Sequence, residues 1–502
     1  MFKLLKSSRK YKMVKCRIGT KELEFRTMNE FYNYENFNDI TSIDEFKHKI
    51  IKIRKYPTSL KSFSFRKQKA TNLTIFSESE TIMPPSFRKI IYSYCCIYEF
   101  PEIPHNIEEF ICDRNQICSI NKHIMFLKIL DCSYNFIKRV NIISKSLVIL
   151  NCVGNYIKNF ENLPETLEEL DCSHNLLTEL INLPESLLKL TCTNNKIANI
   201  IIPKNLKYLD CAYNEITILD ELPDSLKKIR CHYNLLTTII FPKNLTYLRC
   251  NKNKIKRLGK MPTSLIYLNC SCNKIDKIEE LSNNIVVLDC SKNCICDLGE
   301  LPSKLEILLC YKNKIKQFSD IPNKLKILNC EINEITKIDK LPDTLIGLNC
   351  CYNKINEIDI VKLNNLIRFE CKNNKIEYIT LPLNINTLIC DENVKLYNVP
   401  DLLKKMNEHN FDNIYDMFMV GKICNNDILN KLHINYDKID EKINEKNECL
   451  ICHLNTKCIH LPCNDEHMYC LMCFVKWYCN NKNKLKCCIC FKDFFIADSI
   501  YY

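Results

Sequence analysis

The residues best suited to chemistry lie between positions 449 and 490, where cysteine and histidine recur at short spacings. Three C-x-x-C pairs are present, and one more cysteine and one histidine lie between the first two pairs. The eight residues are Cys449, Cys452, Cys463, His467, Cys470, Cys473, Cys487 and Cys490. A C-x-x-C hairpin brings two thiolates to one ion, and four such ligands form a closed structural zinc site. Eight ligands therefore predict two structural Zn²⁺ ions, which replace a hydrophobic core that so short a segment cannot build.

Cys458 and His460 form another possible ligand pair, with the spacing C-x-H, between the first two C-x-x-C pairs. This pair does not complete the pattern, because no cysteine lies at position 466. Cys479 is also left over.

The full spacing, C-x2-C-x10-C-x3-H-x2-C-x2-C-x13-C-x2-C, resembles the C3HC4 RING finger. The resemblance implies crossed ligation. One ion is held by Cys449, Cys452, Cys470 and Cys473, and the other by Cys463, His467, Cys487 and Cys490. It also implies that Ile451 and Trp477, the only tryptophan, contact a ubiquitin-conjugating enzyme (E2). Two positions depart from the family: Cys488 follows the seventh ligand instead of proline, and Phe491 follows the eighth instead of a basic residue. These departures bear on catalytic activity and not on the zinc sites.

Cysteine is used in a second way along a repeat of about twenty residues, L-x-x-L-x-C-x-x-N-x-I-x-x-I. Each of fifteen cysteines is followed three residues later by asparagine, from Asn115 to Asn393. The cysteines are Cys112, Cys132, Cys152, Cys172, Cys192, Cys211, Cys231, Cys250, Cys270, Cys290, Cys310, Cys330, Cys350, Cys371 and Cys390.

The alternation around each cysteine predicts a short strand. In "LDCS", Leu170 and Cys172 share one face and Asp171 and Ser173 share the other. Such a strand cannot bury its apolar face alone, so stacked copies are expected to form a parallel sheet over a continuous core. The asparagine amide is expected to bond backbone groups of the adjacent turn. The frequent Leu-Pro step predicts an extended return, too short for a full helix. These cysteines are therefore predicted to be packing residues, because an odd number cannot all pair and a ladder does not converge on a metal.

The pattern resembles leucine-rich repeats over residues 87–396, in the short Leu-Pro form seen in bacterial effector proteins and some large DNA viruses. We predict an α/β-type solenoid, a curved array with a parallel β-sheet on its concave face, plus a small zinc-stabilised RING domain. The expected domains are a basic region of unknown fold (1–80), the repeats (81–396, about 15–16), a helical linker (397–447) and the RING (448–495). "PTSLKSFSF" at 57–65 echoes the motif faintly and is not counted as a repeat.

Outward strand positions are expected to line the concave face, where tyrosines alternate with charges of both signs. Aromatic anchors of this kind suit protein recognition, and the lack of a uniform basic stripe argues against nucleic acid on this surface. The alternative is a solvated strand face with scattered tyrosines. The expected substrate contacts are Tyr208, Tyr213, Tyr233, Tyr247, Tyr267, Tyr311 and Tyr352. The other outward residues are Asp171, His174, His232, Arg249, Asn269 and Asn329.

Composition limits the compartment and the partners. The chain has 502 residues, 34 cysteines and a net charge of +12, and residues 1–70 hold 18 basic against 7 acidic residues. No signal peptide or run of about 18 apolar residues is visible, so reduced thiols in the cytoplasm or nucleus are expected, in a host cell if the protein is viral. The basic segment 1–70 either forms a solvated surface or attracts nucleic acid or anionic lipid.

Repeats that bind a protein, joined to a RING, resemble an E3 ubiquitin ligase. The resemblance implies that the RING holds a ubiquitin-loaded E2 without forming a covalent intermediate. The alternatives are a non-catalytic scaffold with an inactive RING or a structural zinc module, and a nucleic-acid binder acting through the basic segment.

Overall fold

The computed structural model describes residues 14–25, 28–46, 57–66, 84–101, 103–120, 126–140, 144–278, 280–399, 446–448, 455–461 and 464–470. The contacts between residues divide the chain into two units, Met1–Leu403 and Lys404–Tyr502.

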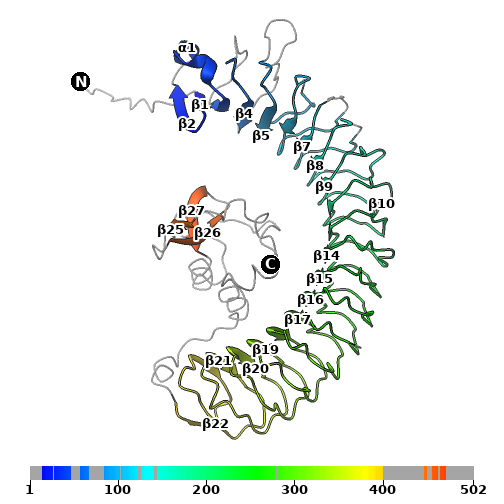
Figure 1. Ribbon diagram of the computed structural model, residues 1–502, viewed down its shortest axis with the longest axis vertical. Coiled ribbons are helices and arrows are strands. Elements are labelled where there is room, and N and C mark those ends of the chain that lie inside the picture. Colours follow the sequence, from blue (N-terminus) through cyan, green and yellow to red (C-terminus); the bar gives the residue numbers. More distant parts are fainter. Residues whose placement is uncertain are drawn as a thin grey trace, which may run out of the picture. The chain divides into compact units, whose positions relative to one another are not determined.

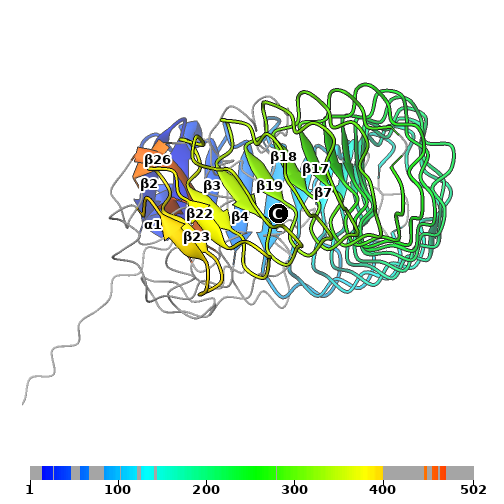
Figure 2. The same ribbon diagram turned by 90° about the horizontal axis from the view of Figure 1, so that it is seen from below.

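A 20-stranded sheet dominates the first unit. From β3 onward, every strand of this sheet pairs in parallel with the strand of the next turn, as β17, β18 and β19 do (Figures 1 and 2). The repeat strands are β5 (Lys89–Ser93), β6 (Glu109–Ile111), β7 (Ile129–Asp131), β8 (Ile149–Asn151), β9 (Glu169–Asp171), β11 (Lys189–Thr191), β13 (Tyr208–Asp210), β14 (Lys228–Arg230), β15 (Tyr247–Arg249), β16 (Tyr267–Asn269), β17 (Val287–Asp289), β18 (Ile307–Leu309), β19 (Ile327–Asn329), β20 (Gly347–Asn349), β21 (Arg368–Glu370) and β23 (Thr387–Ile389).

The sequence alternation explains why each strand is so short. In β9, Leu170 is 1 % exposed, whereas Glu169 and Asp171 on either side are half-buried. The strand ends where Cys172 begins a turn, and Leu167, Cys172 and Leu177 complete the buried set of that turn. Each fully buried leucine contributes about 1.5–3 kcal/mol, so the stack of turns is held together mainly by this apolar interior.

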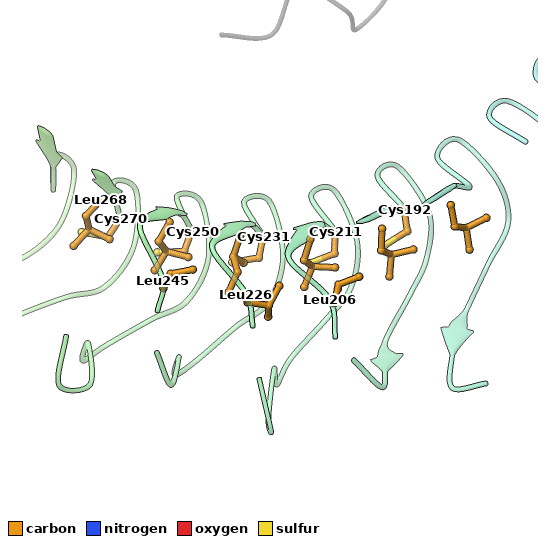
Figure 3. Packing of buried hydrophobic residues seen from close by; sticks show 14 of the residues in the cluster. Cys192, Leu206, Cys211, Leu226, Cys231, Leu245, Cys250, Leu268 and Cys270 are labelled. Carbon is orange, nitrogen blue, oxygen red and sulfur yellow. The ribbon is translucent and has the colours of Figure 1, made fainter. Parts of the chain in front are cut away.

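The repeat cysteines form a buried row, as predicted. Fourteen of the fifteen are at most 2 % exposed, and only Cys390 in the last turn is half-buried. Figure 3 shows Cys192 to Cys270 lying one behind another beside the leucines. Between residues 14 and 399, the cysteines that the structure describes are free thiols. Burial raises their pKa values, to about 12 for Cys250, which keeps them protonated and inert.

The repeat asparagines also act as predicted. The Asn175 amide donates to the carbonyl oxygens of Cys152 (3.0 Å) and Cys172 (3.1 Å), and its Oδ1 accepts from the backbone N–H of Ile157 (2.9 Å). The same bonds recur in turn after turn, for example at Asn333, which donates to the carbonyl of Cys310. Each asparagine therefore joins its own turn to the preceding one by satisfying buried backbone groups.

The solenoid starts earlier in the chain than residue 81. Its first end is closed by β1 (Val14–Ile18), β2 (Lys21–Phe25), α1 (Met28–Tyr32), the 3₁₀ helix η1 (Phe37–Asp39), β3 (Ser42–Phe46) and β4 (Ser62–Arg66). Strands β2 and β3 flank β1 antiparallel, and β4 joins β3 and β5 in parallel. The echo at 57–65 is thus a true turn of the solenoid, with Leu60 and Phe63 fully buried.

The α/β class predicted for the solenoid overstates its helix content. Across the described turns, the returns are extended segments and tight turns, and both helices of the described part, α1 and η1, precede the repeats. Two short parallel ladders join some returns: β10 (Glu179–Leu180) with β12 (Asn199–Ile200), and β22 (Tyr378–Thr380) with β24 (Lys395–Tyr397). A return of about ten residues that begins and ends on the sheet has no room for a helix of several turns.

The second unit contains a three-stranded antiparallel sheet of β25 (Lys446–Glu448), β26 (Asn455–Leu461) and β27 (Asn464–Cys470). Strands β26 and β27 form a hairpin in which Cys458 lies opposite Cys470 in the ladder. In the portion of the chain that the structure describes, no helix has the length and apolar character needed to cross a membrane.

Candidate protein-binding face

The strands of the sheet line the concave side of the solenoid (Figure 1), and the residues that alternate with the buried leucines are the more exposed ones of these strands. Two strand positions per turn, one on each side of the central leucine, are half-buried along most of the array. A third position follows the cysteine, and a fourth lies in the turn just before the asparagine. We use the term concave face for these four positions.

Three of the seven predicted tyrosines lie on strands. Tyr208 is in β13, and Tyr247 and Tyr267 are register partners in β15 and β16. The rings of Tyr247 and Tyr267 stack with centroids 4.3 Å apart and an interplanar angle of 6°. Burial raises the pKa of both Tyr208 and Tyr267, so these phenols stay protonated.

Three other predicted tyrosines lie in the turn and not on a strand. Tyr213, Tyr233 and Tyr352 have φ values of 55°, 53° and 54°. These values lie in the left-handed region, which residues other than glycine rarely adopt. The rings of Tyr213 and Tyr233 stack with centroids 4.2 Å apart, whereas Tyr352 is 53 % exposed. The seventh, Tyr311, follows the cysteine after β18. The predicted tyrosines therefore occupy three positions of the repeat: on the strand, just after the cysteine and just before the asparagine.

Two residues expected to point outward are buried. Asn329 is 3 % exposed, and its Oδ1 accepts a bond from the backbone N–H of Glu331 (3.1 Å). His232 is 6 % exposed and packs edge-on against the rings of Tyr213 and Tyr233. Burial, together with the charges of Arg249, Arg230 and Lys252, lowers the pKa of His232 to about 3. Neither residue is available for a partner, because both are almost fully buried.

The other predicted outward residues are half-buried, and two show how the face is ordered. Asp171 accepts bonds from the backbone N–H and the hydroxyl of Ser173 (3.1 and 2.7 Å). His174 bonds Asn194 of the next turn through Nε2 (3.3 Å). Such local bonds hold polar side chains in place along the face before any partner arrives.

Three cations that the sequence analysis did not single out lie among the tyrosines. Lys228 and Arg230 occupy the two outward positions of β14, and Lys252 lies in the turn after β15. Together with Arg249 they form what we call the cationic patch. The alternation that identified Arg249 applies equally to Lys228 and Arg230, and Lys252 stands just before the repeat asparagine, at the same offset as Tyr213 and Tyr233.

The cationic patch is built against tyrosine rings. The Lys228 ammonium lies 5.5 Å from the centroid of Tyr208 and 4.8 Å from that of Tyr247. The Lys252 ammonium lies 4.1 Å from the Tyr233 centroid and also hydrogen-bonds the Tyr233 hydroxyl. Contacts of this kind stabilise a cation through the electron-rich ring face.

Charge crowding affects the patch. Burial and the neighbouring Arg230 lower the pKa of Lys228 to about 8. Arg230 pairs with Asp210, with 3.5 Å between Nη1 and Oδ2. The face around β14 and β15 is therefore positively charged and partly desolvated.

Most of the predicted zinc and E2 residues lie outside the described residues. These are Cys449, Cys452, Cys463, Cys473, Cys487, Cys490, Ile451 and Trp477. His467 and Cys470 lie in β27, three residues apart, and the rival pair Cys458 and His460 lies in β26. Among the side chains that the structure describes, no three or more histidine, cysteine, aspartate or glutamate residues are grouped so that they could hold a metal ion.

Comparison with known proteins identifies the architecture. No protein-family model and no curated protein sequence matches the chain. Among solved structures, YopM from Yersinia enterocolitica is 26 % identical and matches with a TM-score of 0.63, covering 72 % of this chain and 83 % of that one.

Two further structures match with TM-scores below 0.5. YopM from Yersinia pestis, described as a leucine-rich effector protein, is 24 % identical with a TM-score of 0.48 and covers 65 % of this chain and 88 % of that one. A leucine-rich repeat protein of Leptospira interrogans is 21 % identical with a TM-score of 0.46 and covers 64 % and 88 %. With its stacked parallel strands, buried leucine and cysteine rows and asparagine ladder, the first unit has the leucine-rich repeat fold.

Proposed function

We propose that this chain is an E3 ubiquitin ligase whose repeats bind a protein substrate on the concave face and whose RING recruits a ubiquitin-loaded E2. The observation that supports recognition is the ordered set of tyrosines and cations along the concave face, on the strands and in the turns that follow them. Tyrosine and arginine dominate the binding energy of protein interfaces. Their stacking in the free protein lowers the entropy cost of binding, since little side-chain freedom is left to lose.

The proposal for the tail is supported by ligand spacing together with the hairpin. Strands β26 and β27 occupy the segment between the first C-x-x-C pair, Cys449 and Cys452, and the second, Cys470 and Cys473, and β27 ends at Cys470. Seven thiolates and one imidazole fit Zn²⁺, which favours sulfur and nitrogen donors. The bound ions would fix the fold of the segment and would supply no reactive water, because all four positions on each are filled by the chain.

In this proposal the chain contributes positioning. A lysine amine of the substrate attacks the thioester carbonyl carbon on the E2, an isopeptide bond forms, and the E2 cysteine leaves as its thiol. The repeats would hold the substrate and the RING would hold the E2, which raises the effective concentration of the two reactants. No residue of the chain forms a covalent intermediate.

Reconstitution tests the catalytic part. The full chain with E1, a panel of E2 enzymes, ubiquitin and ATP is expected to form ubiquitin chains, and Ile451→Ala or Trp477→Ala should abolish them. Tyr378→Ala is a matched control, because it removes a 57 % exposed aromatic side chain from the solenoid. Unchanged activity in both RING variants would refute the E2 surface. Binding of an E2 without transfer would favour the scaffold alternative.

Metal analysis tests the zinc sites separately. The full chain is expected to bind two equivalents of zinc, and Cys449→Ser/Cys452→Ser should remove one of them. Cys118→Ser/Cys296→Ser is the control, since these two exposed cysteines lie in the solenoid. Fewer than two equivalents in the parent chain would contradict the assigned ligand set.

Quantitative pull-down tests the recognition part. Partners captured by the parent chain from cell extract are compared with those captured by Tyr247→Ala/Tyr267→Ala. We expect a set of proteins to be lost in the variant and retained by Tyr378→Ala. Identical partner sets in all three would show that the concave face is a solvated strand face.

A further inference from the structure

The array has a rule for placing charge on neighbouring strands. Where two charged residues are register partners, they are generally of opposite sign. Glu169 pairs with Lys189, with 3.2 Å between their charged atoms, and Lys89 pairs with Glu109 at 2.6 Å. Opposite charges at this spacing stabilise the sheet, and like charges destabilise it.

The cationic patch breaks this rule. Arg230 in β14 and Arg249 in β15 are register partners, so their backbones lie about 4.8 Å apart. Residues 228–233 and 247–252 contain no aspartate or glutamate. The ion pair that Arg230 makes with Asp210 reaches back to the preceding turn. At the centre of the concave face, two guanidinium groups of like charge therefore lie on neighbouring strands, with Arg230 paired to Asp210 and Arg249 Nε donating to Asn251 Oδ1 (3.1 Å).

The same positive charge continues along the edge of the sheet. Residues 228–316 hold 16 Lys/Arg against 7 Asp/Glu, a surplus of nine in a chain whose total is +12. The edge cations after the strands of these turns are exposed; they are Lys252, Lys254, Lys256, Arg257, Lys274, Lys277, Lys292, Lys312, Lys314 and Lys316. A charged surface of this extent attracts an oppositely charged partner over a distance.

We propose that the cationic patch of Lys228, Arg230, Arg249 and Lys252 binds an Asp/Glu-rich segment of the protein recognised by the concave face. This inference rests on the proposed function, because it takes the concave face as the partner-binding surface. Carboxylates placed beside Arg230 and Arg249 accept charge-assisted hydrogen bonds from the guanidinium groups.

The tyrosine geometry favours an acidic peptide over nucleic acid. Proteins that bind single strands stack bases on open aromatic faces. Here Tyr247 and Tyr267 stack on each other, and Lys228 lies against Tyr208 and Tyr247. Tyr213 and Tyr233 also stack on each other. Ring faces that are occupied in this way leave hydroxyl groups and ring edges for a partner, which suits peptide groups and carboxylates.

The titrating groups around Lys228 define how binding responds to pH. Arg230 neighbours Lys228 on the same strand, Arg249 lies on the next strand, Asp210 is paired with Arg230, and Tyr208 and Tyr247 lie against the Lys228 ammonium. The low pKa of Lys228, about 8, follows from burial and from Arg230. A bound carboxylate favours the protonated lysine, so binding is coupled to proton uptake.

Fluorescence anisotropy of a labelled deca-glutamate peptide with the full chain tests the proposal. The variant Arg249→Gln/Lys252→Gln leaves the Asp210–Arg230 pair intact and is expected to weaken binding about tenfold or more. Lys324→Gln/Lys362→Gln, which removes the same charge from two exposed lysines elsewhere on the solenoid, should change the affinity less than about threefold. Lys228→Gln is a second variant within the patch, and circular dichroism verifies folding of each.

Equal weakening by both double variants, or no weakening by either, would overturn the proposal. A ten-nucleotide single-stranded DNA that binds more tightly than the peptide, with the same dependence on Arg249 and Lys252, would also overturn it in favour of nucleic acid. Failure here is distinguishable from failure of the proposed function. If Tyr247→Ala/Tyr267→Ala loses its partners while deca-glutamate does not bind, the concave face recognises protein by another chemistry.

Discussion

Asn234→Ala is the sharpest test of how the solenoid is held together. The Asn234 amide donates to the carbonyl oxygens of Cys211 (2.9 Å), Cys231 (3.1 Å) and His232 (3.4 Å), and its Oδ1 accepts from the backbone N–H of Ile216 (3.0 Å). Alanine leaves the buried Cys211 carbonyl and Ile216 amide of the preceding turn without this partner. Each unsatisfied buried group costs about 1–3 kcal/mol, so we expect a loss of about 2–6 kcal/mol in the free energy of unfolding.

The assay is urea unfolding followed by far-UV circular dichroism, which reports on the whole sheet. Repeat arrays are stabilised by nearest-neighbour interfaces, so a weakened central interface should lower the midpoint and can split the transition into two steps. Asn393→Ala is the matched control, because this residue is exposed in the last turn, and it should change the midpoint little. A central variant as stable as the parent chain would show that the ladder bonds are replaceable by water and that apolar packing alone sets the stability.

Three further predictions concern backbone, charge and thiols. Gly154→Ala places a Cβ 2.7 Å from a tyrosine ring of the preceding turn at φ +67°, whereas Gly299→Ala at φ +66° meets no atom within 4 Å. The free energy of unfolding measured in urea should fall for both, by about 1 kcal/mol for Gly299→Ala and by more for Gly154→Ala. The affinity for deca-glutamate should fall as the pH rises from about 7 to about 9. Burial and Arg230 lower the pKa of Lys228 to about 8, so Lys228 loses its proton in this range, and the free chain then binds fewer protons than the complex. A pH-independent affinity would exclude this lysine from the site. Iodoacetamide should label the exposed Cys296 in the folded chain and the buried repeat cysteines only in urea, as peptide mass mapping would show. Rapid labelling of the repeat cysteines in the folded chain would contradict their burial.

The sequence was sufficient to predict the interior of the solenoid because the interior repeats. Leucine, cysteine and asparagine recur at fixed offsets, and each has one environment in every turn, so a single turn such as that of Cys172 and Asn175 describes the others. The turn that contains β4 was not predicted, because it lacks these recurring residues. At its equivalent positions Phe65 replaces cysteine and Gln68 replaces asparagine, and an end turn has no preceding repeat of the same kind to bond.

The concave face was predicted less completely than the interior. Strand alternation correctly placed Tyr208, Tyr247 and Tyr267, but it gives no information once the strand has ended. The left-handed turn moves Tyr213 and Tyr233 to the edge, and the burial of His232 depends on the rings of two neighbouring turns. Contacts between turns depend on which residues happen to be register partners, and that becomes visible only when the turns are stacked.

The ladder also determines which changes in chain length the fold tolerates. Successive cysteines are 19 to 21 residues apart, yet the strands stay in register, so the single-residue differences are absorbed on the return side. Insertion or deletion of one whole unit would shift the rest of the array by about one strand spacing, ~4.8 Å, and would leave every buried row continuous. A gene carrying this pattern could therefore lengthen or shorten its product by unequal recombination between copies, and so alter the reach of the recognition surface, without redesign of the interior.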